Sequence, residues 1–89
     1  MAVRDASAAE RQRLALAAGE GVVIAEHGMA GGEAGLRQGD VVLRVGRTPV
    51  ATAADFNRAL AGTAPGQSRI LLVRRSGATQ VLTVTAPER

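Results

Sequence analysis

The apolar residues of this 89-residue chain occur in short runs that are rich in valine and bounded by glycine. The clearest are Val22–Glu26, which follows Gly21, and Asp40–Val45, which lies between Gly39 and Gly46. Runs of this length with many β-branched residues are typical of strands. No run approaches the roughly 20 apolar residues that a membrane-spanning helix needs. We therefore expect a soluble domain organised around a β-sheet.

The composition is sufficient for one folded domain. Hydrophobic residues make up 46% of the chain and charged residues 21%, a balance that favours folding over disorder. Only Phe56 is aromatic, so the core must be almost entirely aliphatic. A chain of this length forms a single domain, here residues 1–89.

The numbers of cysteine, histidine and charged residues argue against several functions. The chain has no cysteine, which removes disulfides and thiolate metal sites, and one histidine with eight scattered carboxylates argues against a metal centre. Eleven arginines give a net charge of +3. Without aromatic residues among them to stack on bases, they do not indicate a nucleic-acid-binding surface. No pattern calls for a cofactor.

Two helix-start signals stand out. Ser7 and Glu10 have the spacing of a capping box, which predicts a helix from Ser7 to Ala18 that is stopped by the following glycines. Thr52 with Asp55 predicts a second helix over residues 53–61. In that helix Phe56 and the residue four positions later share one face and should point into the core.

The remaining segments complete a small α+β domain. Residues 27–39 contain five glycines and hold at most one helical turn around residues 32–36. We expect strands at Ala2–Arg4, Val22–Glu26 and Asp40–Val45, an edge or turn at Thr48–Val50, and a hairpin of Arg69–Arg75 and Thr79–Thr85 with its turn at Ser76–Gly77. The predicted fold is a curled, mainly antiparallel sheet, a partly open β-sandwich or barrel, capped by two helices.

No catalytic motif is present. A serine nucleophile would need His27 as its base, but Ser7 is explained as a cap, Ser76 as a turn residue, and neither they nor Ser68 lie in a Gly-x-Ser-x-Gly elbow. The glycines after His27 lack the lysine of a phosphate-binding loop. Asp40, at a strand start, is expected to bind backbone N–H groups.

A binding surface is the remaining possibility. A helix beside an edge strand leaves a groove in which an extended peptide can add to the sheet. On the helix over residues 53–61, Ala53, Asn57 and Ala61 should flank the core-facing stripe. Their small size would leave room for a bulky apolar side chain, although alanine is abundant throughout this chain.

The segment Gly35–Val50 resembles the central signature of PDZ domains. It contains Gly-Leu, then Gly39-Asp40, an apolar strand, a glycine turn and Pro49 followed by an apolar residue. Residues 54–60 look like the helix of the PDZ groove, and Leu71–Gly77 is similar to the family's Val-x-Arg-x-Gly hairpin. An N-terminal strand with an extra helix in residues 1–20, before a core of residues 21–86, is similar to the bacterial, circularly permuted type, in particular the second PDZ domain of Do-like (HtrA) envelope serine proteases.

The resemblance implies a function in binding, not catalysis. Such domains bind exposed C-termini or extended apolar segments by strand addition, and they recruit substrate to the attached protease domain or regulate it. Carried over to this chain, the peptide would pair with the strand at Ala2–Arg4. Its terminal side chain would enter a pocket. The residues implied are Met1, Ala2, Val3, Arg4, Ala53, Asn57, Leu60 and Ala61.

The family's carboxylate-binding loop would lie just before Ala2. We therefore expect it to be missing here or reduced to Met1–Val3. A bacterial cell-envelope or periplasmic location follows from the resemblance alone. The alternatives are a PDZ domain of another host, namely a C-terminal processing protease, an intramembrane protease or a secretion component, or a subunit-assembly domain without a peptide ligand.

Overall fold

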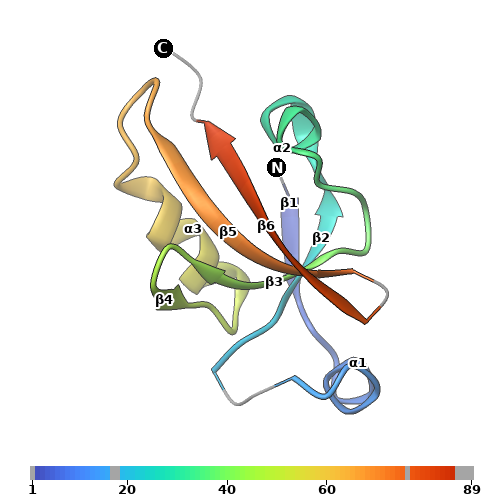
Figure 1. Ribbon diagram of the computed structural model, residues 1–89. Coiled ribbons are helices and arrows are strands. Elements are labelled where there is room, and N and C mark those ends of the chain that lie inside the picture. Colours follow the sequence, from blue (N-terminus) through green and yellow to red (C-terminus); the bar gives the residue numbers. More distant parts are fainter. Residues whose placement is uncertain (1, 17–18, 76, 86–89) are drawn as a thin grey trace.

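The computed structural model describes residues 2–16, 19–75 and 77–85, which form an antiparallel, open, six-stranded sheet with three short helices (Figure 1). In chain order the elements are β1 (Ala2–Asp5), α1 (Ala8–Arg13), β2 (Val22–Glu26), α2 (Gly28–Ala34), β3 (Val41–Val45), β4 (Thr48–Pro49), α3 (Ala53–Ala61), β5 (Ser68–Arg75) and β6 (Ala78–Thr85). The strands are ordered β1-β2-β3-β5-β6, and β4 pairs with β3. The predicted α+β class is confirmed. In these residues no helix is long and apolar enough to cross a membrane.

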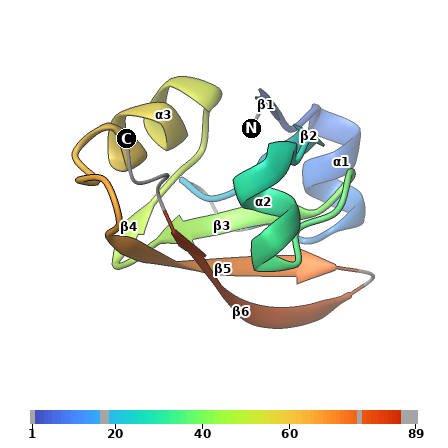
Figure 2. The same cartoon turned by 90° about the horizontal axis from the view of Figure 1, so that it is seen from above.

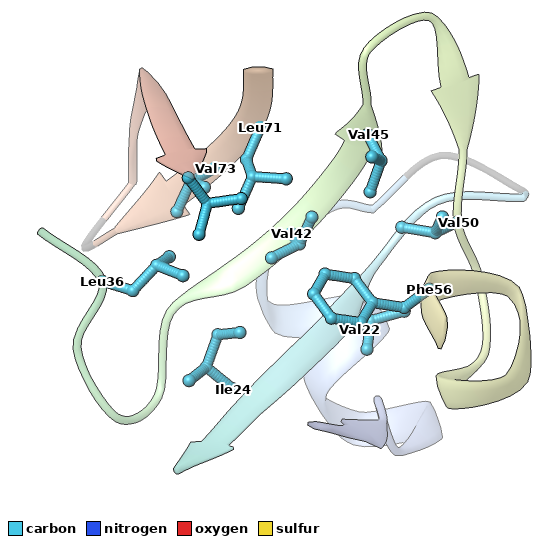
Figure 3. Packing of buried hydrophobic residues seen from close by; sticks show 10 residues of the cluster. Val22, Ile24, Leu36, Val42, Val45, Val50, Phe56, Leu71 and Val73 are labelled. Carbon is cyan, nitrogen blue, oxygen red and sulfur yellow. The ribbon is translucent and has the colours of Figure 1, made fainter. Parts of the chain in front are cut away.

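Strands β2 and β3 are buried on both faces over Val22–Ile24 and Val41–Leu43, which explains why these residues are all apolar. Alternate residues point to opposite sides of a strand, so Val22 belongs to one buried cluster and Val23 to another. The main cluster lies between the sheet and helices α2 and α3, which share one side of β3 and β5 (Figure 2). Its buried members are Val22, Ile24, Leu36, Val42, Val45, Val50, Phe56, Leu71, Val73 and Val84 (Figure 3).

The C-terminal hairpin forms as predicted. β5 and β6 pair from Ser68 opposite Thr85 to Arg75 opposite Ala78. Gly77, in the connection, has a φ of 83°, a conformation that glycine adopts readily. The expected turn includes Ser76, which lies outside the described residues.

Helix α1 is shorter than predicted. It begins at the expected capping box but ends at Arg13, with Leu14 as its C-cap, instead of continuing to Ala18; residues 17 and 18 lie outside the described residues. Both Leu14 and Leu16 pack against the second cluster, formed by Val23, Val41 and Leu43. In a continued helix these leucines would face opposite sides. The chain instead turns at Ala15, whose φ is 52°, and both leucines reach the same apolar surface.

Helix α2 is longer and starts earlier than the single turn predicted around residues 32–36. It spans Gly28–Ala34 and ends at Gly35, which has a φ of 95° and donates its N–H to the carbonyl of Gly32. Glycine-rich sequence has low helix propensity. Contacts with β6 and the burial of Leu36 just after the helix therefore account for its formation.

Candidate functional site

Strand β1 is one edge of the sheet. It pairs with β2 in antiparallel register, with Arg4 opposite Val23 and Asp5 opposite Val22. Among the described strands, none pairs with its other side. The backbone N–H and C=O groups on that side, here called the β1 edge, are therefore open to pairing with an added strand.

Helix α3 lies beside β1, and a hydrogen bond joins them. The Ala53 N–H, at the start of α3, donates to Oδ1 of Asp5 at 2.8 Å. Further contacts connect the two elements. The arrangement expected from the sequence, a helix next to an edge strand, is therefore present.

Local interactions fix the position of α3. Thr52 caps the helix, since its Oγ1 accepts a hydrogen bond from the N–H of Asp55 at 3.1 Å. The Asp55 carboxylate in turn accepts from the N–H of Ala51 at 3.2 Å. Phe56 is 1% exposed, and its ring points toward Val22 and Val42 (Figure 3). The predicted cap and the predicted core position of Phe56 are both confirmed.

The candidate site residues divide between β1 and α3. Val3 and Leu60 are half-buried and pack against the main cluster. Ala2, Arg4, Asn57 and Ala61 are exposed, Ala53 is half-buried, and Met1 lies outside the described residues.

Arg4 is held by α1. Its Nη1 and Nη2 donate to the two carboxylate oxygens of Glu10, each at 2.8 Å. Glu10 also completes the predicted capping box, because it accepts the N–H of Ser7 while the Ser7 hydroxyl accepts the N–H of Glu10. The hydrogen bond from Arg4, followed by that from Ser7, lowers the pKa of Glu10 to about 2. The capping box could be predicted from the sequence, but the contact of Arg4 with Glu10 could not. Residue spacing within a strand or within a helix does not predict a contact between the two elements.

Asp40 has a structural role, as expected. It is 3% exposed and accepts the N–H of Arg37 at 2.9 Å. Arg75 also binds it, with Nε at 2.8 Å, and bonds the carbonyl of Gly35 through Nη2. Burial alone would raise the pKa of Asp40, but the hydrogen bonds and charges of Arg75 and Arg37 outweigh burial and lower it. This network joins the end of α2 to β5.

His27 is exposed and lies next to α2, with Nδ1 2.7 Å from the Gly28 carbonyl oxygen. It lines a cleft of about 400 Å³ with Ala25, Glu26, Gly28 and Gln38. Within the described ranges, histidine and carboxylate side chains form no cluster that could hold a metal ion.

Comparisons with known proteins agree with this geometry. The sequence profile of the PDZ domain matches residues 2–86. Among curated protein sequences, none matches the chain. The structure of the HtrA-type protease AlgW with a decapeptide superimposes with a TM-score of 0.86 and 26% identity, over 99% of this chain and 27% of that one. This chain thus corresponds to about a quarter of AlgW.

A second solved structure supports the fold. The HtrA3 PDZ domain bound to a phage-derived ligand, FGRWV, superimposes with a TM-score of 0.75 and 16% identity, over 96% of this chain and 79% of that one. The family profile covers nearly the whole chain. The same residues form the strand order and the α3–β1 arrangement described above. The chain therefore belongs to the PDZ domain family, and its fold resembles that of PDZ domains in HtrA-type proteases.

Proposed function

We propose that this chain is a peptide-binding PDZ domain of an HtrA-type serine protease in the bacterial cell envelope. It binds C-terminal or extended apolar segments and thereby recruits substrate to a protease domain or regulates it. The observation that carries the proposal is the β1 edge, which none of the described strands pairs with and which is adjacent to α3. The AlgW structure, which superimposes on 99% of this chain, contains a decapeptide, and this supports the proposal.

The bound segment adds to the sheet as a further strand. Its backbone pairs with the β1 edge along Ala2–Arg4, which is the recognition mode called β-augmentation. Its side chains then lie between β1 and α3. The residues proposed to line that space are Met1, Val3, Ala53, Asn57, Leu60 and Ala61.

We expect the affinity to be micromolar or weaker. β1 has four residues, so it can form only a few hydrogen bonds with a ligand. Each contributes about 1 kcal/mol net, and about four such contributions correspond to a dissociation constant on the order of 1 mM from backbone pairing alone. The burial of one apolar ligand side chain against Val3 and Leu60 strengthens binding further and lowers the dissociation constant.

Fluorescence anisotropy of a labelled peptide that ends in Val or Leu tests the proposal. The matched variants are Asn57→Glu, on the exposed side of α3, and Thr79→Glu, on exposed β6; both add one negative charge. We expect weaker binding by Asn57→Glu and unchanged binding by Thr79→Glu. Equal effects of both variants, or no binding by the unmodified domain, would contradict the proposal.

The same peptide with an amidated C-terminus identifies the kind of segment that is bound. Binding of the free acid alone would indicate a carboxylate site at Met1–Val3. Equal binding of both peptides would indicate strand addition without capture of the terminus, which suits internal segments of unfolded substrates.

A further inference from the structure

The last residue of β1 is bonded to the first residue of α3. The Asp5 carboxylate accepts the N–H of Ala53 at 2.8 Å, although 48 residues separate the two in sequence. The contact, here called the Asp5–Ala53 latch, thus connects at one end the two elements proposed to flank a bound segment.

The latch lies on the face where ligand side chains would be placed. Val3 packs against the main cluster, and side chains two positions apart in a strand share a face, so Asp5 points to the same side as Val3. A strand added at the β1 edge would present alternate side chains to this side, next to α3. At the Asp5 end, the space between strand and helix is already crossed by the Asp5 side chain.

Asp5 also has a defined task at the helix terminus. The first N–H groups of a helix need acceptors from outside the helix. The Thr52 hydroxyl is the acceptor for the N–H of Asp55. In the described residues the Asp5 carboxylate is the acceptor for the N–H of Ala53. Asp5 is exposed and Ala53 is half-buried, so water or a ligand can replace either partner.

From this geometry we infer that the Asp5–Ala53 latch limits the length of segment that β1 accepts. This inference rests on the proposed function. A segment that pairs only alongside Ala2–Arg4 leaves the latch intact. A longer segment must displace the Asp5 side chain, so residues beyond this point add little affinity. The domain therefore favours short chain ends over long extended segments.

Two substitutions of Asp5 separate the contact from the charge. Asp5→Ala and Asp5→Asn each remove one negative charge, but the asparagine oxygen still accepts a hydrogen bond from Ala53. Two labelled peptides with the same apolar C-terminal residues are compared by anisotropy. The short one spans only Ala2–Arg4 of β1 and ends before Asp5, and the other is about twice as long.

We expect the wild-type domain and Asp5→Asn to bind both peptides with similar affinity. Asp5→Ala should bind the short peptide like wild type and the long one several-fold more tightly. The same gain with length in wild type and Asp5→Ala would overturn the inference and leave the proposed function standing. Behaviour of Asp5→Asn like that of Asp5→Ala would also overturn it, because charge would then be the cause. If none of the three domains binds either peptide, both the inference and the proposed function would be overturned.

Amide hydrogen exchange provides a second measurement that needs only the wild-type protein. The Ala53 amide should be protected in the free domain, remain protected with the short peptide, and lose protection with the long one. Protection that persists with the long peptide bound would overturn the inference even if Asp5→Ala failed to fold.

Discussion

The guanidinium of Arg4 binds both carboxylate oxygens of Glu10, each at 2.8 Å, so the edge strand β1 is attached to helix α1. The same carboxylate caps the first turn of α1. One side chain therefore holds the start of the helix and the middle of the strand. Protonation of Glu10 weakens both contacts.

Acid should loosen this connection in a defined pH range. The pKa of Glu10 is about 2 in the folded domain and about 4.5 when unperturbed. Because folding lowers it, the stabilisation is fully present above pH 4.5 and is lost as the pH falls toward 2. Thermal unfolding of wild type and Glu10→Gln, followed from neutral pH down to about 2, measures the effect. The variant should be less stable near neutrality and show a smaller loss in acid; parallel pH curves would contradict this prediction.

Replacement of Asp40 should be among the more damaging single changes. Asp40→Asn removes the charge partner of Arg75, whose side chain is 22% exposed. Breaking a buried ion pair from one side costs about 3–5 kcal/mol, and the partial exposure of Arg75 places the expected loss at about 3 kcal/mol. Urea unfolding measures it. The control Asp55→Asn, whose ion pair with Arg58 is largely exposed, should cost about 1 kcal/mol or less.

Phe56 anchors α3 in the main cluster, and its removal should lower the stability of the domain. Phe56→Ala leaves a cavity beneath the helix and is expected to cost about 3–5 kcal/mol. Phe56→Leu retains much of the apolar volume and should cost less. A loss below about 1 kcal/mol for Phe56→Ala would contradict the packing in Figure 3.

The same Ala→Gly substitution should have opposite effects at two positions. Ala15 has a φ of 52°, a region that is unfavourable for residues with a Cβ, so Ala15→Gly should stabilise by up to about 1 kcal/mol. Ala9 is exposed within α1, where Ala9→Gly should destabilise by about 0.5–1 kcal/mol. Chemical denaturation of the two variants checks the pair. The same sign at both positions would argue against the turn at Ala15.

The features predicted correctly are those encoded within a few residues. Ser7 and Thr52 mark helix starts through contacts three positions away, and alternating or continuous apolar runs mark the strands. The end of α1 was not predictable in this way, because it depends on Leu16 reaching a surface formed by Val23 and Leu43. Local propensity favours a longer helix there, and tertiary packing overrides it.

The candidate site follows the same division. The β1 edge and the position of α3 follow from the family signature, whereas the contacts of Asp5 with Ala53 and of Arg75 with Asp40 join residues 48 and 35 positions apart. No periodicity links such residues. Asp5 lies next to a short predicted strand, and no sequence pattern connects it with the start of α3, where the structure places its carboxylate.

The position of β1 at the edge also determines when the proposed site can exist. Its neighbours come later in the chain: β2 pairs with one side, and α3, which ends at Ala61, lies beside it. Contacts between distant segments form only after the intervening chain is available and its loop has closed. During synthesis the ribosome must therefore deliver most of the domain before the first strand has its complete surroundings. Unfinished chains therefore lack the completed site, and binding at the proposed site would require a domain that is largely synthesised and folded.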